Sequence, residues 1–208
     1  MTSFEGIDLA CVRGERLVFA GLGFQVDPGE ALVLVGANGS GKSSLLRLMA
    51  GLIGPASGRM LWGGVPTTDD PEAHRERLGY LGHLDAVKPS LSVRENLAFW
   101  ASLAGAGSTM AALEAFGLDR LADLPGRYLS QGQRRRLALA RVAATTPELW
   151  LLDEPSVGLD RASLAALAGV IQRHRQGGGR VVVATHAELE LGLTRTLDLD
   201  RFRRMGTA

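Results

Sequence analysis

The densest group of residues that could do chemistry is a glycine-rich loop that ends in a lysine and a serine. Residues 36–43 have the sequence Gly-Ala-Asn-Gly-Ser-Gly-Lys-Ser and fit the phosphate-binding pattern G-x-x-x-x-G-K-[ST]. Glycines let the backbone wrap around a polyphosphate with its N–H groups turned inward. We expect Lys42 to reach the β- and γ-phosphates of ATP, and the Ser43 hydroxyl to ligate Mg²⁺. The predicted nucleotide-binding residues of this loop are Gly36, Ala37, Asn38, Gly39, Ser40, Gly41, Lys42, Ser43 and Ser44.

Two adjacent carboxylates end an apolar segment later in the chain. Asp153 and Glu154 follow Leu149–Leu152, which has the composition of a buried strand. Burying two charges is expensive, so this pair has no structural use inside a sheet. Near a phosphate loop, Asp153 would hold Mg²⁺ through water, and Glu154 would orient and deprotonate the attacking water. The alternative is a pair of acids that caps a helix after the strand.

The phosphate loop lies between a predicted strand and a predicted helix. Ala31–Val35 is a continuous apolar run, typical of a strand that is covered on both faces. After the loop, residues 45–49 follow a helical pattern that Gly51 closes. The N-terminal end of that helix carries a partial positive charge and faces the same anion as the loop. This context distinguishes the loop from a chance glycine-rich turn.

The remaining pattern predicts one α/β domain over residues 1–208. Upstream, Ile7–Val12, Leu17–Phe19 and Phe24–Val26 predict an antiparallel hairpin meander. Downstream, strands at Leu149–Leu152 and Arg180–Ala184 enclose a helix from about residue 161 to residue 175, which three glycines end. The fold class that we expect is therefore a P-loop ATPase with a mixed core sheet and an antiparallel β subdomain.

A helical subdomain is predicted between about residues 89 and 145. Strand signals are missing there, and helical segments occupy about Val93–Leu103 and Met110–Phe116. Ser92 to Glu95 has the sequence of a capping box, which satisfies the first backbone N–H groups of a helix. We therefore expect this subdomain to be inserted between strands of the sheet.

Composition limits the classes of function. The 208 residues carry a formal net charge of +1, which argues against a nucleic-acid partner. The single cysteine, Cys11, excludes an intrachain disulfide and is expected to pack within a strand. No run approaches the roughly 20 apolar residues that span a bilayer. Action at a membrane would therefore require another protein. His74 and His174 lie on polar helical stretches and are expected to be solvated.

A third motif makes the interpretation specific. Residues 129–133, Leu-Ser-Gln-Gly-Gln, precede a helix rich in arginine, alanine and leucine. They resemble the LSGGQ signature of ABC ATPases, with Gln131 in place of the first glycine. Asp160 stands in a segment that resembles the family's D-loop, and His186 in one that resembles its switch-histidine segment. The motifs follow in the family's order and cover essentially the whole chain.

The resemblance implies an ATPase in which two chains hold two ATP molecules head to tail. Ser130 and Gly132 open a helix, so they offer a hydroxyl, N–H groups and a positive helix end to the γ-phosphate on the other subunit. Gln133 and Asp160 are predicted to join the ATP-binding set. His186 would contact the γ-phosphate and fix the geometry of Glu154 and the water. Neither ATP site would be complete in one chain.

Two positions depart from the family's pattern. His83 stands where the family usually has a glutamine, and it is predicted to sense the metal site and the membrane partner. An imidazole ligates differently from an amide, and loop packing is the alternative role. The aromatic residue that stacks on adenine is missing, and Arg13 occupies roughly its place. A guanidinium can also stack on a base, so Arg13 is predicted to contact the nucleotide.

Three segments point to one subfamily. They are the early Cys-x-Arg-x-Glu-Arg segment, the Gly-His-Leu-Asp segment at 82–85 and the arginine-rich helix after the signature. They resemble the ATP-binding subunit of the haem exporter of bacterial cytochrome c maturation. That resemblance implies a peripheral subunit on the cytoplasmic face of the inner membrane. It would pair with integral membrane transporter subunits, which are expected to handle the haem themselves.

Other functions stay open at this point. The chain could serve a transporter for another small substrate with unchanged ATPase chemistry. A non-transport ABC ATPase is a second alternative, although repair factors insert a long coiled coil where this chain has a compact segment. A regulatory subunit that binds ATP without cleaving it is the third, and Glu154 and His186 argue against it. Trp100 is expected to pack, and it could lie near the groove for a membrane partner.

Overall fold

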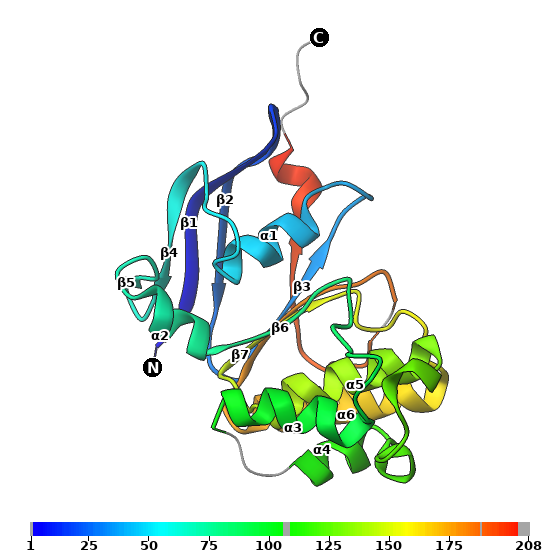
Figure 1. The fold of residues 1–208 in the computed structure, drawn as a ribbon. Helices are drawn as coiled ribbons and strands as arrows, with labels where there is room; N and C mark the ends of the chain where they lie inside the picture. The colour runs from blue at the N-terminus through cyan, green and yellow to red at the C-terminus, as the bar shows by residue number, and fades with distance from the viewer. Residues whose placement is uncertain (1, 106–108, 188, 204–208) are drawn as a thin grey trace.

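The computed structural model describes residues 2–105, 109–187 and 189–203, which form two sheets and a group of helices (Figure 1). The strands are β1 (Phe4–Arg13), β2 (Arg16–Val26), β3 (Ala31–Val35), β4 (Ser57–Trp62), β5 (Val65–Pro66), β6 (Leu78–Leu81), β7 (Leu149–Asp153), β8 (Arg180–Ala184) and β9 (Arg195–Asp198). The helices are α1 (Lys42–Met49), α2 (Pro71–Glu76), α3 (Val93–Leu103), α4 (Thr109–Ala115), α5 (Gln131–Ala144) and α6 (Arg161–Gln176), with the 3-10 helices η1 (Asp119–Leu121), η2 (Gly126–Tyr128) and η3 (Leu199–Phe202). None of the helices in these ranges is long and apolar enough to cross a bilayer.

The first sheet is antiparallel and has the strand order β2-β1-β4-β5. The predicted hairpin is present, but its second and third segments, Leu17–Phe19 and Phe24–Val26, both belong to the single strand β2. The third strand of this part is instead β4, which pairs with the other edge of β1. Gly21 has a positive φ of 71°, so β2 continues through a local irregularity where the sequence pattern suggests a break.

The core sheet has the order β6-β7-β8-β3-β9, and its described pairs are all parallel. The α/β class with parallel and antiparallel strands is confirmed, and the two pairing modes are divided between two sheets. β6 and β9 extend the sheet beyond the strands that we expected. β9 carries Arg195 and Asp198 in four residues and is largely exposed, so its composition does not resemble that of a core strand.

Side chains of the core sheet alternate between two hydrophobic clusters, as the period of a strand requires. Leu149 and Leu151 of β7 belong to the cluster that includes α1 and the antiparallel sheet. Trp150 and Leu152 belong to the cluster that includes α5 and α6. Both faces of β7 are covered, which explains its continuous apolar sequence. Burial of each leucine side chain stabilises the folded state by roughly 1.5–3 kcal/mol.

The helices α3, α4 and α5 pack together within the second cluster, through residues such as Leu97, Leu113 and Leu137. The predicted capping box is present at the start of α3. Ser92 Oγ accepts a hydrogen bond from the Glu95 N–H, and the Glu95 carboxylate accepts one from the Ser92 N–H. The first helical turn is therefore held by side chains of its own sequence.

The expectation that His74 and His174 are solvated is wrong. His74 is 3% exposed, and its Nε2 lies 2.8 Å from the Met49 carbonyl oxygen. His174 is half-buried and stacks on Trp150 with ring centroids 4.2 Å apart. Burial lowers the pKa of both imidazoles, that of His174 to about 4. Both lie on helices with many polar residues, so the burial comes from tertiary packing that helix periodicity does not encode.

The parallel strands bring distant segments to one edge of the core sheet. Gly36 follows β3, Glu154 follows β7, and Thr185 follows β8. Since the carboxyl ends of neighbouring parallel strands meet, these segments lie side by side. This edge is where the phosphate loop, Glu154 and the segment that carries His186 come together.

Candidate functional site

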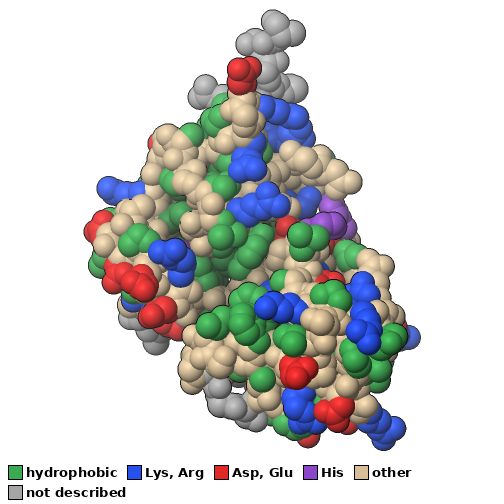
Figure 2. Space-filling model, viewed as in Figure 1, with side chains coloured by type: hydrophobic (Ala, Val, Ile, Leu, Met, Phe, Trp, Pro, Cys, Tyr) green, Lys and Arg blue, Asp and Glu red, His purple; other side chains and the backbone are tan. Residues whose placement is uncertain are grey.

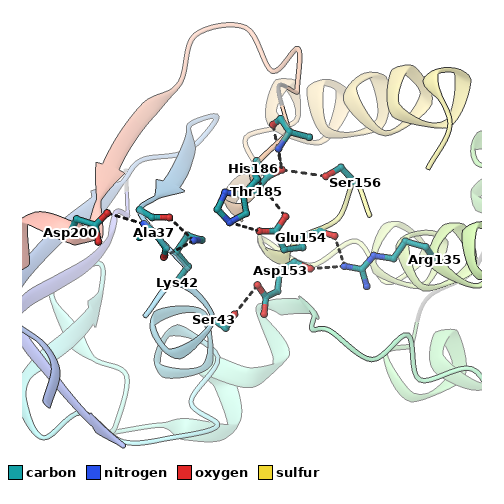
Figure 3. A network of polar contacts seen from close by, with 12 residues as sticks. Ala37, Lys42, Ser43, Arg135, Asp153, Glu154, Ser156, Thr185, His186 and Asp200 are labelled. Carbon is teal, nitrogen blue, oxygen red and sulfur yellow. Dashed lines mark hydrogen bonds and ion pairs between the residues drawn. The ribbon is translucent and has the colours of Figure 1, made fainter. Parts of the chain in front are cut away.

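The phosphate loop forms a turn that only glycines allow. Gly36, Gly39 and Gly41 have φ values of 138°, 77° and 105°. A Cβ on Gly41 would lie 2.6 Å from Cγ1 of Val18, so the loop also packs too closely on β2 for any other residue. Lys42 Nζ donates hydrogen bonds to the carbonyl oxygens of Gly36 at 2.7 Å and Ala37 at 3.3 Å. The lysine side chain therefore lies along the loop (Figure 3), and its predicted contact with the phosphates stays a prediction.

The start of α1 fits a polyphosphate. Gly41 is the N-cap residue and makes no side-chain hydrogen bond to the first turn. The Ser40 hydroxyl is buried and lacks a hydrogen-bond partner within the described residues. A helix N-terminus with uncapped N–H groups attracts anions because its partial charge is positive. The loop, the helix end and Lys42 together provide the donors that phosphate oxygens accept.

Asp153 at the end of β7 reaches the same helix. Its Oδ1 accepts a hydrogen bond of 3.0 Å from Ser43 Oγ, and the residue is 5% exposed. A hydroxyl and a carboxylate oxygen are ligands that Mg²⁺ prefers, with phosphate oxygens and water completing the octahedron. No group of three or more His, Cys, Asp or Glu side chains suited to a metal occurs among the described residues. Ser43 and Asp153 are the residues here whose oxygens fit Mg²⁺.

Glu154 is held in an unusual backbone conformation beside His186. Its φ is +48°, in the left-handed region, and its N–H donates to the Ala184 carbonyl oxygen at 2.8 Å. Its carboxylate lies 3.6 Å from His186 Nε2 and accepts a 3.4 Å hydrogen bond from the His186 N–H. Non-glycine residues in this conformation often occur at functional sites. The carboxylate is partly open to solvent and can accept a proton from water.

The segment before His186 is tied to the segment after Glu154. Thr185 Oγ1 lies 3.3 Å from Ser156 Oγ and accepts a hydrogen bond from the Ala187 N–H. These contacts fix the turn that carries His186 relative to the turn that carries Glu154 (Figure 3). The sequence does not predict a role in the site for Ser156 and Thr185, because serine and threonine are common in loops.

A carboxylate from the far end of the chain also reaches the phosphate loop. The Ala37 N–H donates a 2.8 Å hydrogen bond to Asp200 Oδ2, and this bond lowers the pKa of Asp200. Asp200 belongs to η3, directly after the unexpected strand β9. The contact joins residues that are 163 positions apart, so no local signal in the sequence indicates it.

The signature residues lie at the N-terminus of α5 and on the surface. Ser130 and Gln133 form a complete capping box: Ser130 Oγ accepts from the Gln133 N–H, and Gln133 Oε1 accepts from the Ser130 N–H. A Cβ on Gly132 would lie 2.5 Å from the Gly158 carbonyl oxygen, which explains the glycine at this position. The signature therefore packs directly against the segment that precedes Asp160.

Asp160 has a local structural role in addition to its predicted one. Its Oδ1 accepts a 2.8 Å hydrogen bond from the Ser163 N–H and caps α6. Hydrogen bonding to Ser163 lowers the pKa of Asp160, so its carboxylate is charged at neutral pH. The predicted contact of Asp160 with ATP stays a prediction.

The predicted contact of Arg13 with the nucleotide stays a prediction. Arg13 ends β1 at the tip of the hairpin and is exposed. Burial raises the pKa of the neighbouring Cys11 thiol, while the charge of Arg13 and a hydrogen bond with Ser44 lower it. The predicted stacking of Arg13 on adenine is an expectation that this arrangement permits.

His83 lies elsewhere. It is exposed and lines an open groove between the part of the molecule that carries α1 and α2 and the part that carries α3 and α5. Within the described residues it makes no hydrogen bond to Ser43 or Asp153. Its predicted role as a metal ligand stays a prediction.

The chain is similar to known proteins over most of its length. The ABC transporter family matches residues 19–157. The cytochrome c biogenesis ATP-binding export protein CcmA of Rhodospirillum rubrum is 59% identical over 96% of this chain and 86% of its own length. The protein of the same name from Paramagnetospirillum magneticum is 55% identical over 97% and 95%. A solved ATP-binding subunit of an ABC transporter covers 88% of this chain and 79% of its own, at 26% identity and a TM-score of 0.80. The chain belongs to the ABC transporter family of ATP-binding proteins.

Proposed function

We propose that this chain is the ATP-hydrolysing subunit of an ABC transporter complex that drives haem delivery for cytochrome c maturation. The observation that carries the proposal is the similarity, over nearly the whole chain, to proteins named for ATP-binding export in cytochrome c biogenesis. Cytochromes of the c type hold haem covalently, so their biogenesis requires haem at the place of attachment. The phosphate loop, the Asp153–Glu154 pair, the signature and His186 support a role in supplying energy for this step.

Each residue of the site has a role in the proposed hydrolysis. Lys42 and the loop N–H groups hold the β- and γ-phosphates, and Ser43 and Asp153 hold Mg²⁺. The ion would neutralise negative charge on the phosphate oxygens. Glu154 accepts the proton of the attacking water, and His186, 3.6 Å away, orients its carboxylate and contacts the γ-phosphate.

A second copy of the chain completes the ATP site in this proposal. The signature residues 130–133 are capped by their own side chains, and within the described residues no hydrogen bond or ion pair joins them to the phosphate loop. Their exposed helix end suits the γ-phosphate of ATP on another chain. We therefore place two chains head to tail with two ATP molecules between them.

The groove that His83 lines is the proposed contact with the membrane subunits. It has a volume of about 1240 Å³, and Figure 2 shows hydrophobic side chains gathered in the hollow between the two parts of the molecule. Leu52, Leu84 and Leu103 line it and are 59%, 81% and 68% exposed. Exposed apolar side chains in a groove indicate a protein partner. Trp100 also lines the groove.

This docking defines the cellular location in the proposal. The chain is a peripheral subunit on the cytoplasmic face of the bacterial inner membrane, held there by integral membrane subunits. Its single domain, 1–208, has no nucleic-acid partner.

A membrane pull-down in the source organism tests the proposal. Tagged protein would be recovered in mild detergent, and its partners would be identified by mass spectrometry. The same experiment would be done with the variant Leu103→Glu. Val65→Glu is the matched control, because Val65 is a similarly exposed apolar residue on β5 that does not line the groove. In a deletion strain, covalently bound haem in c-type cytochromes would be measured after complementation with each variant.

We expect the wild type and Val65→Glu to recover the same membrane proteins and to restore c-type cytochromes, and Leu103→Glu to do neither. Normal cytochrome c in the deletion strain would remove the haem proposal. Recovery of an unrelated permease would point to a transporter for another small substrate, and recovery of no membrane protein to an ATPase without transport.

A further inference from the structure

Three arginines follow the signature on α5, and their side chains go to different places. Arg134 donates to the Arg127 carbonyl oxygen at the surface, and Arg136 donates to that of Phe116 at 3.0 Å. Arg135 instead turns inward and is 4% exposed. A buried guanidinium is costly unless its charge and its N–H groups find partners. The partners that Arg135 finds lie in two separate segments of the chain.

One end of the Arg135 guanidinium holds the segment that carries both catalytic carboxylates. Its Nη2 donates hydrogen bonds to the carbonyl oxygens of Asp153 and Glu154, the second at 2.8 Å (Figure 3). The two acceptors belong to consecutive residues, and the second has the left-handed φ of +48°. Because the carbonyl groups before and after the Glu154 Cα are both fixed, the direction in which its side chain leaves the backbone is fixed as well.

The other end of the guanidinium holds the segment that lines the groove. Its Nη1 donates to the Gly82 carbonyl oxygen at 3.0 Å and to Asp85 Oδ1 at 2.8 Å. Asp85 is 21% exposed at its side chain and supplies the opposite charge. His83 lies between Gly82 and Asp85 in the sequence, and both Gly82 and His83 line the groove. One buried side chain thus contacts the turn after β6 and the turn after β7.

We propose that Arg135 is a positioning residue that sets the orientation of Glu154 and transmits to it the position of residues 82–85. Within the described residues the guanidinium bonds the backbone carbonyl groups of Asp153 and Glu154 and not their carboxylates, so it acts through the backbone of Glu154. A displacement of about 1 Å in a catalytic group can lower a rate about a hundredfold. The proposal rests on ATP hydrolysis at Glu154 and is independent of the exported substrate.

The test compares Arg135→Gln and Arg135→Lys with Arg136→Gln, measured on the full chain purified with its membrane partners. Arg136 is the matched control, since it lies on the same helix and also donates to a backbone carbonyl. We expect Arg135→Gln to lower kcat about 10- to 100-fold while KM and the ATP dissociation constant measured without Mg²⁺ change less than about threefold. Arg135→Lys, which keeps a charged donor, is expected to recover part of kcat, and Arg136→Gln to stay within about twofold of the wild type.

Amide hydrogen exchange tests the same contact without turnover. The Glu154 N–H, which donates to Ala184, and the amides of residues 82–86 should exchange faster in Arg135→Gln than in Arg136→Gln. Asp85→Asn, at the groove end of the contact, should lower kcat in the same direction. Unchanged kcat and unchanged exchange in Arg135→Gln would overturn the proposal. So would parallel losses of kcat, ATP affinity and melting temperature in both Arg135 variants, which indicate a purely structural role. Absence of ATP hydrolysis in the wild type would instead count against the proposed function.

Discussion

Two helices of the molecule begin at predicted phosphate-binding motifs, and their N-termini differ. α1 begins after Gly41 without any side-chain cap, beside the Lys42 ammonium group and a Ser40 hydroxyl that has no partner in the described part of the chain. α5 begins after Ser130 with a complete capping box, in which Ser130 and Gln133 satisfy each other's backbone N–H groups. The first helix end is open toward an anion in a single chain. The second is satisfied by its own sequence.

The difference indicates how ATP binding divides between the two motifs. The loop before α1 is shaped by glycines, and the first turn of α1 has no side-chain cap for a phosphate to displace. At the start of α5, the hydroxyl and N–H groups are already bonded to each other in the capping box. A charged acceptor such as a phosphate can replace these bonds, because charge-assisted hydrogen bonds are the stronger ones. We therefore expect α1 to dominate ATP affinity and α5 to respond only when a second chain presents its bound ATP.

The largest effect is expected at Glu154, the proposed general base, where a substitution should slow ATP hydrolysis greatly and leave ATP binding intact. Glu154→Gln is expected to lower kcat by about 10²–10⁴-fold and to leave ATP binding to the open helix end intact, since the amide cannot accept the proton of water. Steady-state ATPase measurements and ATP binding on the same sample test this. Glu148→Gln, just before the other end of β7, pairs with Arg77 and Arg180 and serves as the control. A Glu154→Gln variant with normal turnover would rule out Glu154 as the base.

The next effect is at the open helix end itself. Lys42→Ala should weaken ATP binding about 10- to 100-fold, because it removes a charged donor to the β- and γ-phosphates. Equilibrium binding of ATP to the purified chain measures it. Lys88→Ala is the matched control, since Lys88 lies over the ring of Phe99, away from the loop. Equal affinities of the two variants would contradict the role of the loop.

The capping box of α5 can be compared with that of α3 by the same substitution in each. Ser130→Ala and Ser92→Ala each remove a capping-box hydroxyl, at a cost of about 1 kcal/mol in the free energy of unfolding. Only Ser130→Ala should also lower the ATPase rate, by about tenfold, because only that hydroxyl is proposed to meet a phosphate. Denaturant unfolding and ATPase rates measure the two effects. If both variants lost activity equally, the effect would be one of helix stability.

The smallest expected effect lies away from both helix starts. The pKa of His174 is about 4, below the ordinary value of about 6.5, because burial against Trp150 disfavours its charged form. Between pH 6.5 and 4 the unfolded chain binds a proton that the folded chain does not, so the free energy of unfolding falls as the pH falls. His174→Phe keeps an aromatic ring and should remove this loss, on the order of 1 kcal/mol at pH 5 after allowing for solvent screening. Unfolding curves at pH 7 and pH 5 test it, and ATP affinity at pH 7 should not change.

The parts of the site that the sequence predicts are those built from neighbouring residues. The phosphate loop, the Asp153–Glu154 pair at the end of β7 and the capping box of Ser92 and Glu95 depend on short-range spacing, so the sequence alone indicates where they lie. The contacts of Arg135 with Gly82 and of Asp200 with Ala37 depend on how the sheet is assembled. No local pattern encodes such pairs.

The fold shows the same division. The buried strands β3, β7 and β8 are apolar almost throughout, so the sequence pattern predicts them, and the family is confirmed by the comparisons. The pattern does not predict the edge strand β9, because its exposed side chains do not require apolar residues. The burial of His174 escapes prediction because its stacking partner, Trp150, lies on another element.

The most direct test of the two-chain site is the mass of Glu154→Gln in solution, by sedimentation with and without MgATP. We expect the 22.1 kDa chain to double in mass with MgATP and to stay single without it. Adding Ser130→Asp, which keeps a helix-capping oxygen but opposes the γ-phosphate, should abolish the dimer and leave ATP bound. A Glu154→Gln chain that binds MgATP and stays at 22.1 kDa would contradict an ATP site shared between two copies.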